Sequence, residues 1–307
     1  MLEKLLKPRF PSSAVGIKTG TASVVQLERS RGAFVIKRAA TINLPASVVR
    51  SSFDESNVLD PSGLAAALAD LTTSAGLLRQ KKWSVTLPEA SARTAIVTLE
   101  TTGGSRREIE EVLDWKIERT FGAPVDELRI GRQDLPANEQ KQARFLITAV
   151  RAAILAEYES VFGAMGWHTG LMLPRHVGEE QWLTNGSAGD GLLLSAHDEG
   201  FTAVLLRNNR PLILRTVFCD TEECNDELHR LLLFYRDRAG SDVAASSVNR
   251  LLVMGDLLNK QRVAEIAQET LGEDLRPLTA SDVGLTIPGD LPFDLIAAPA
   301  GLARLAW

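Results

Sequence analysis

Two glycines and a threonine surround a lysine near the start of the chain, in a run that could contact phosphate groups. Gly16, Lys18, Gly20 and Thr21 belong to the sequence GIKTGT. Glycine allows a backbone to approach a bound anion closely, and a lysine ammonium group binds phosphate as a point charge. A phosphate-binding hairpin normally carries an acid where Lys18 stands, and a lysine cannot ligate a hard cation such as Mg²⁺. The run therefore predicts the remains of a nucleotide site.

A second group, Ser195, His197 and Asp198, has the side-chain types of a hydrolase. These residues lie in the run LLLSAHD, which is typical of a strand. Because side chains alternate along a strand, Ser195 and His197 share one face and Asp198 points to the other. The chain contains no Gly-x-Ser-x-Gly turn, which a hydrolase of this kind would need. We interpret the group as a solvated strand end.

A tryptophan on the most strongly patterned helix is a candidate for partner binding. Ser105 and Glu108 have the spacing of a capping box, and an apolar stripe follows it. Trp115 lies at the edge of that stripe, in the company of Glu111, Glu118 and Arg119. An aromatic side chain there either packs on its own subdomain or anchors a peptide in a groove.

Composition excludes several classes of protein. The 307 residues are 45% hydrophobic and 24% charged, with a net charge of −5, which is typical of a soluble globular chain and unsuited to nucleic acid as the main partner. We expect no membrane span and no secretory signal, and therefore a cytoplasmic location. The histidines outside the run above lack metal-ligand spacing. Cys219 and Cys224 are expected to stay reduced.

The periodicity of the chain predicts mixed α and β elements. After a leader over residues 1–11, three closely spaced β-branched runs predict an antiparallel meander. A helix follows with both ends specified, because Asp60 suits the N-cap, Pro61 the first helical position and Gly76 the stop. A second set of three strands and a helix begins near residue 190, so the pattern predicts a duplicated fold with a first domain at 12–180 and a second at 181–307.

These features resemble a known family, the actin-like proteins of type IV pilus assembly (PilM and its relatives). The resemblance lies in VGIKTGTASVVQLE, in the block SVTLPEASARTAIVTLETTGGSRREIEEVLDWKIERTFGAPVDELRIGRQDL and in LITAVRAAILAEYESVFGAMGW. It implies a two-domain α/β fold of the actin-like (ribonuclease H-like) type, with a subdomain inserted at about 83–150. It also implies a closing helix at about 297–307 that returns to the first domain.

The same resemblance implies a place and a partner. Members of this family lie on the cytoplasmic face of the inner membrane and bind the cytoplasmic tail of a membrane protein, PilN. The arrangement is also similar to the cytoplasmic part of the type II secretion protein GspL. We expect a PilN-like partner and no nucleic acid. Association into dimers or filaments is left open, as is the choice between pilus and secretion system.

The family usually holds ATP between its domains, and this sequence departs from that pattern at three places. Lys18 replaces an acid in the first hairpin, Ser195 and His197 replace the acid and glycine of the second, and Gly255 is the one glycine left in LLVMGDLLN. Because charge neutralisation by Mg²⁺ is central to phosphoryl transfer, we expect a scaffold without hydrolysis and without a resident cofactor. The alternative is a working member that binds ATP; a small-molecule kinase is disfavoured by the missing acids.

Overall fold

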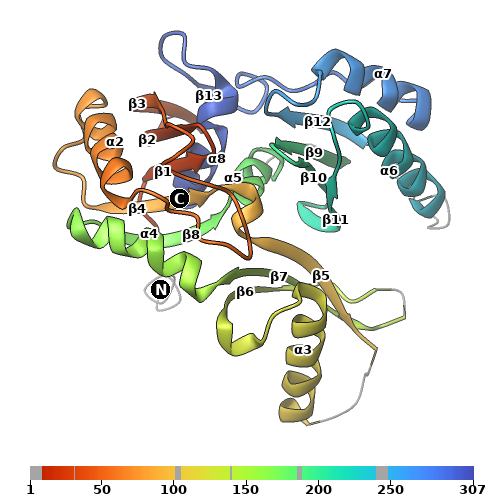
Figure 1. The fold of residues 1–307 in the computed structure, drawn as a ribbon. Helices are drawn as coiled ribbons and strands as arrows, with labels where there is room; N and C mark the ends of the chain where they lie inside the picture. The colour runs from red at the N-terminus through yellow and green to blue at the C-terminus, as the bar shows by residue number, and fades with distance from the viewer. Residues whose placement is uncertain (1–8, 31, 101–104, 139, 185–188, 240–247) are drawn as a thin grey trace.

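The structure, a computed structural model, describes residues 9–30, 32–100, 105–138, 140–184, 189–239 and 248–307. Most of the expected leader over residues 1–11 lies outside these ranges. Within the described ranges the strands form three sheets of six, four and three strands (Figure 1).

The six-stranded sheet contains the predicted meander. Its order is β13-β3-β2-β1-β4-β8, in which β1, β2 and β3 are antiparallel neighbours and β4 and β8 run parallel to β1. The strands span Ser13–Lys18 (β1), Thr21–Ser30 (β2), Ala33–Asn43 (β3), Lys82–Leu87 (β4), His168–Pro174 (β8) and Leu285–Thr286 (β13).

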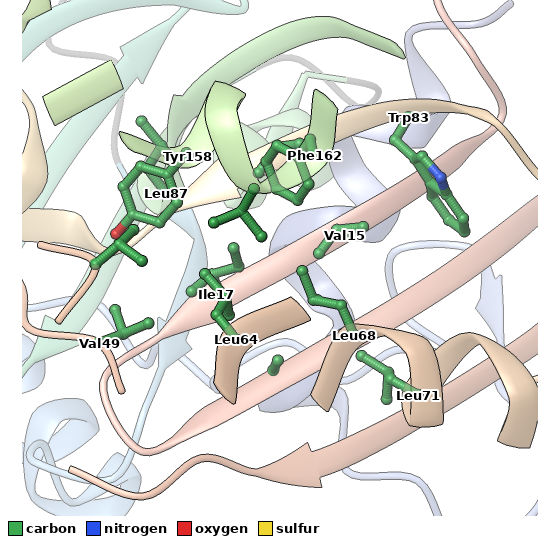
Figure 2. Packing of buried hydrophobic residues seen from close by; sticks show 14 of the residues in the cluster. Val15, Ile17, Val49, Leu64, Leu68, Leu71, Trp83, Leu87, Tyr158 and Phe162 are labelled. Carbon is green, nitrogen blue, oxygen red and sulfur yellow. The ribbon is translucent and has the colours of Figure 1, made fainter. Parts of the chain in front are cut away.

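Helices α2 (Pro61–Ser74) and α4 (Ala152–Ala164) cover one face of this sheet. Val15 and Ile17 point to that face, as alternation along β1 requires, and meet Leu64 and Leu68 of α2 (Figure 2). Trp83, Tyr158 and Phe162 complete a fully buried core. The predicted N-cap of α2 is confirmed, since Asp60 accepts a hydrogen bond of 2.9 Å from the Gly63 amide.

The four-stranded sheet has the order β11-β10-β9-β12. Its strands are Asp190–His197 (β9), Gly200–Arg207 (β10), Arg210–Phe218 (β11) and Val248–Met254 (β12), and β12 runs parallel to β9. Helices α6 (Cys224–Ala239) and α7 (Lys260–Leu271) cover its outer face.

One helix, α8 (Phe293–Arg304), lies between the two larger sheets. It packs on β1 and β2 of the first sheet, and it shares one apolar cluster with Leu193 and Leu252 of the second. The short helix α5 (Arg175–Glu180) and the turn η3 (Gln181–Leu183) pack beside it. The expected closing helix thus begins about four residues earlier than position 297, because Pro292 already serves as its N-cap.

The three-stranded sheet, β5-β7-β6, forms a separate layer with its own core under α3 (Arg106–Phe121). Its strands are Arg93–Leu99 (β5), Leu128–Leu135 (β6) and Ala143–Arg151 (β7), and the short turns η1 (Glu89–Ser91) and η2 (Val125–Glu127) flank it. The insertion was expected from about residue 83, but β4 pairs with β1 and β8, so this sheet begins at Arg93. The predicted capping box of Ser105 and Glu108 is present.

The two cysteines correct a prediction. Cys219 and Cys224, which we expected to be reduced, are paired as a disulfide with their Cα atoms 5.5 Å apart. Strand β11 ends at Phe218 and α6 begins at Cys224, and the turn between them brings the two side chains together. This Cα separation is typical of disulfides. The spacing of the cysteines and the expected compartment do not indicate this turn, which depends on where β11 ends and α6 begins.

Candidate functional site

A cavity of about 620 Å³ opens between the two larger sheets. The carboxyl ends of parallel strands face it from both sides: β1 ends at Lys18, β4 leads to Glu89, β9 ends at His197 and β12 leads to Gly255. Arg175, which directly follows β8, completes its floor. This is the position at which open α/β sheets bind ligands. We call this space the interdomain cleft.

Three of the residues predicted for a nucleotide cleft line this cavity, namely Lys18, His197 and Gly255. Asp198 and Asp256 line it as well, and both are exposed at its rim. The residues not among its lining are Gly16, Gly20, Thr21 and Ser195. Their roles as nucleotide contacts stay predictions.

The glycines of the first hairpin have structural explanations that require no ligand. A Cβ atom on Gly16 would lie 2.7 Å from Ser23 Oγ and 3.0 Å from Pro299 Cγ, so glycine makes room for α8. Gly20 has φ of +80° in the turn between β1 and β2, a conformation that favours glycine. Nothing in the described structure lies within 4 Å of a Cβ built there.

Ser195 corrects our interpretation of the second motif. It is fully buried, whereas His197 is half-buried and Asp198 is exposed, so only the last residues of this run are solvated as expected. The physical reason is that β9 is an inner strand, paired with β10 and β12, and helices cover both faces of its sheet. Ala196 and His197, the last two residues of the strand, line the cleft.

A buried charge network beneath the cleft escaped the sequence analysis. Arg175 Nε donates to Glu179 Oε1 at 2.6 Å, and His176 Nδ1 lies 2.5 Å from Glu89 Oε1. Glu180 is buried beside them. The available signal was the run RHVGEE after an apolar strand, because four of its six residues have ionisable side chains in a helix that packs against α8.

Burial and charge shift the pKa values of this network in different directions. Desolvation raises the pKa of Glu180 to about 7, because the opposing effect of His176 is smaller. The pKa of Glu89 falls to about 2, since the attraction and hydrogen bonds of His176 outweigh its desolvation. The pKa of His176 is raised despite its burial, because Glu89 lies against it.

The cleft floor suits an anion better than a metal ion. Burial, followed by the nearby charge of Arg175, lowers the pKa of Lys18, and desolvation lowers that of His197. No group of three or more His, Cys, Asp or Glu side chains in the described part of the chain is placed to hold a metal ion. Mg²⁺ requires oxygen ligands, and Lys18 presents an ammonium group instead. These residues do not fit Mg²⁺–ATP.

A second cavity, of about 540 Å³, lies between the three-stranded sheet and the second domain. Strand β5 contributes Arg93 and Thr94, and β11 contributes Thr216 and Phe218. Both strands are at an edge of their sheet, and they approach each other here. Phe121, the last residue of α3, and the loop that contains Phe53 complete the lining. We call this space the edge groove.

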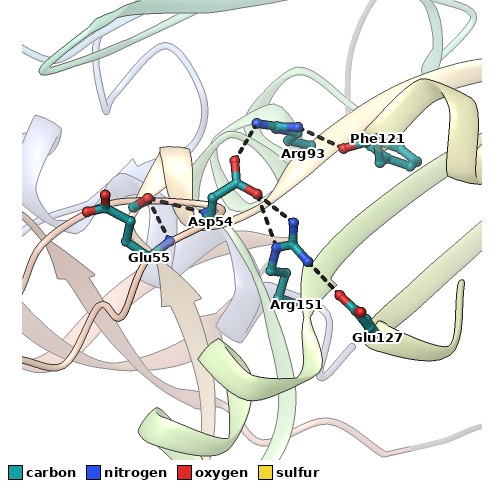
Figure 3. Close-up of polar contacts among 7 residues, drawn as sticks. Asp54, Glu55, Arg93, Phe121, Glu127 and Arg151 are labelled. Carbon is teal, nitrogen blue, oxygen red and sulfur yellow. Dashed lines mark hydrogen bonds and ion pairs between the residues drawn. The ribbon is translucent and has the colours of Figure 1, made fainter. Parts of the chain in front are cut away.

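A network of arginines holds one wall of the edge groove (Figure 3). Asp54 accepts hydrogen bonds from Arg93 Nη2 at 3.1 Å and Arg151 Nη2 at 2.7 Å. Arg93 also donates to the Phe121 carbonyl at 2.8 Å, which satisfies a free acceptor at the end of α3. Both guanidinium groups lie over the ring of Phe53. The wall is therefore ordered by contacts within the protein.

Trp115 lies outside the lining of both cavities. Trp115 is 54% exposed, and the Arg119 guanidinium lies 5.4 Å from its ring centre. Glu118 accepts a hydrogen bond from the Val125 amide, and Glu111 pairs with Arg107. Of α3, only its last two residues reach the edge groove.

Comparison with known proteins gives the fold. No family model matches the sequence, and no curated protein matches it. A solved structure of a PilM–PilN type IV pilus biogenesis complex is similar with a TM-score of 0.76 and 18% identity, over 97% of this chain and 99% of that one. The predicted actin-like fold is confirmed.

Two further solved structures are similar at lower scores. The cytoplasmic domain of EpsL, an inner-membrane component of the type II secretion system of Vibrio cholerae, aligns at 11% identity and a TM-score of 0.49, over 96% of this chain and 93% of that one. The ethanolamine utilization protein EutJ of Carboxydothermus hydrogenoformans aligns at 11% identity and 0.47, over 99% and 94%. No helix among the described residues is long and apolar enough to cross a bilayer.

Proposed function

We propose that this protein is an assembly scaffold of a type IV pilus or a related type II secretion system, and that it acts at the cytoplasmic face of the inner membrane. In this role it binds the cytoplasmic tail of a PilN-like membrane protein. The likeness to the PilM–PilN structure supports the proposal at the level of fold.

The observation that carries the proposal is the edge groove. An extended peptide can pair with an exposed sheet edge through its backbone while its side chains enter neighbouring pockets. In the described residues β5 and β11 have a strand partner on one side each, and the groove lies where they approach. Phe218, 65% exposed, stands at this position as a large apolar contact. Aromatic side chains of this kind dominate peptide-binding energies.

The arginine network supports the same role. The carboxylate of Asp54 and the side chains of Arg93 and Phe53 are already held by one another before a peptide arrives. A preordered wall reduces the entropy that binding must otherwise overcome. A tail with alternating apolar and polar residues would fit a groove that offers phenylalanine rings beside threonine and arginine side chains.

The interdomain cleft supports scaffolding over turnover. Lys18 stands where a metal-binding acid would be needed, and the residues do not fit Mg²⁺–ATP. We therefore expect no release of phosphate from Mg²⁺–ATP above the rate of a blank. Release that is abolished by Lys18→Met would instead favour the working ATPase.

Calorimetric titration with a synthetic PilN-like tail peptide tests the scaffold proposal. We expect Phe218→Ala to weaken binding by about tenfold or more, as for an interface anchor. Leu78→Ala is the matched control, because Leu78 is also 65% exposed and lies outside the groove. Equal affinities of Phe218→Ala and the unaltered protein would contradict the edge groove.

The variant Trp115→Ala distinguishes tail binding in the edge groove from tail binding on the exposed surface of α3. If the tail binds at α3, this variant loses affinity and Phe218→Ala does not. If the tail binds in the edge groove, the pattern is reversed. Absence of binding to the unaltered protein would reject the partner itself.

A further inference from the structure

We propose that Cys219 and Cys224 form a site of reversible thiol–disulfide exchange with a dithiol reductant, and that the state of this site controls how firmly Phe218 is held at the edge groove. The disulfide joins the residue after β11 to the first residue of α6. The inference rests on the function proposed above, because it assigns a regulation to the edge groove and places the disulfide at the cytoplasmic face of the membrane.

The proposed location makes a permanent disulfide unexpected. Glutathione and thioredoxin keep the thiols of the cytosol reduced, and the disulfides that form there are usually transient and act in catalysis or redox sensing. Both cysteines of this chain are nevertheless paired with each other. A disulfide that closes in such a compartment is expected to open again when the supply of reductant rises.

The two cysteines differ in burial, which determines where a reductant attacks. The residues between them, 220–223, are all exposed, so the turn that carries the disulfide lies at the surface. Cys219 is half-buried, whereas Cys224 is 1% exposed and belongs to the core between the four-stranded sheet and its helices. Because exchange requires access to a sulfur atom, the attack is directed to Cys219.

The exchange takes two steps with a dithiol. A thiolate of the reductant bonds to Cys219 Sγ, the bond between the two cysteines breaks, and Cys224 leaves as a thiolate that takes a proton from water. The second thiolate of the reductant then attacks the mixed disulfide, which closes the disulfide of the reductant and releases Cys219 as a thiolate that is protonated in turn. Two electrons and two protons thus pass from the dithiol to the protein, and a disulfide oxidant reverses the reaction.

The disulfide is coupled to the edge groove through the end of β11. Phe218 is 65% exposed, so burial of its own ring fixes little of its position. The next residue, Cys219, is held by its amide, which donates to the Glu199 carbonyl at 3.1 Å, and by its bond to the buried Cys224. The Phe218 ring lies edge to face with His197 at 6.2 Å, and both residues line the groove. Reduction removes the covalent anchor and leaves this strand end free to fray.

Calorimetric titration of the oxidised and the reduced protein with a PilN-like tail peptide tests the inference. We expect reduction by a phosphine to weaken tail binding by about fivefold, because the freed strand end must be ordered again on binding. The double variant Cys219→Ser, Cys224→Ser should bind like the reduced protein under both conditions. Phe218→Ala should bind with the same low affinity in both states. Equal affinity of the two states of the unaltered protein overturns the inference and leaves tail binding itself in place.

Hydrogen exchange reports on the strand end without the peptide. The Cys219 amide should exchange about tenfold faster after reduction, because its local opening becomes easier. The Leu44 amide, which donates to the Gly20 carbonyl in the first domain, is the control and should keep its rate. An unchanged rate at Cys219 overturns the inference whether or not the tail binds. A faster rate in a protein that binds no tail would reject the scaffold proposal and retain the redox control of this strand end.

Equilibration with glutathione buffers tests whether the exchange is reversible. In a buffer poised like the cytosol, about half or more of the chains should carry two thiols, and oxidised glutathione should restore the disulfide. Alkylation followed by mass measurement counts the thiols. A pair that stays closed in this buffer is a permanent constraint and overturns the inference.

Discussion

Gly178 of α5 and Gly301 of α8 cross backbone to backbone. A Cβ atom on either residue would collide with main-chain atoms of the opposite helix, at the Ala298 and Gly178 carbonyl groups respectively. Both positions therefore require glycine for packing, although glycine lowers helix stability elsewhere. This crossing fixes α5, and with it Arg175, against the helix that lies between the two sheets.

The crossing predicts that one added methyl group at Gly301 strongly lowers the stability of the protein. Gly301→Ala should lower the free energy of unfolding by about 3 kcal/mol, because main-chain atoms must move to accept the side chain. Gly163→Ala is the control: this glycine is exposed on α4 with open space around its Cβ, and the change should stabilise the protein by about 0.5 to 1 kcal/mol. Urea unfolding followed by circular dichroism measures both, and equal effects would contradict the crossing.

The buried network predicts that stability declines as pH rises through neutrality. Because the pKa of Glu180 is raised from 4.5 to about 7, its contribution is fully present below pH 4.5 and is lost as pH rises through 7. The raised pKa of His176 and of Glu179 acts in the same direction, and the lowered pKa of Glu89 reduces stability only as pH falls from 4.5 towards 2.

Glu180→Gln tests this dependence. The shift at Glu180 corresponds to about 3 kcal/mol between pH 4.5 and 8, so the amide variant should be the more stable protein at pH 8. Thermal unfolding between pH 5 and 8 should show a flatter profile for the variant. Glu159→Gln, at an exposed site on α4, should leave the profile of the unaltered protein in place. Parallel profiles for all three proteins would reject a titrating Glu180.

The disulfide predicts a measurable constraint on the unfolded chain. Cys219 and Cys224 close a short loop with a sequence separation of 5, and the chain-entropy estimate for such a loop is about 2 kcal/mol. Replacing both cysteines by serine should lower the unfolding free energy by about this amount. A reductant should have the same effect on the unaltered protein and none on the variant. Two reactive thiols in the denatured, unreduced protein would contradict the pairing.

Local features of the fold were predictable because neighbouring residues determine them. Asp60 caps α2 and the Ser105–Glu108 box caps α3, since each motif is completed within four residues. The disulfide and the burial of Ser195 were missed because they depend on where a turn and an inner strand are placed by distant segments. The sequence alone also could not reveal that Gly16 serves the packing of Pro299.

The candidate site was predictable in part. Lys18, His197 and Gly255 were selected from the sequence and line one cavity. Arg175 was not selected, because the run RHVGEE does not itself show that its first residue lines a cleft built by both halves of the chain. Phe218 was missed as well, because an aromatic residue at a strand end indicates a groove only when a second sheet edge lies beside it, and the sequence does not show that.

The interdomain cleft and the edge groove have a wall in common. Arg50, Glu89, His197 and Glu199 line both. Any rearrangement of these side chains by an occupant of one space changes the free energy of occupying the other. Thermodynamic linkage makes such an effect reciprocal. A ligand in the cleft that strengthens tail binding by a given factor would itself be bound more strongly, by the same factor, when the tail is present. Through the shared wall, the occupancy of the interdomain cleft by a small ligand would then depend on whether the scaffold has bound its partner.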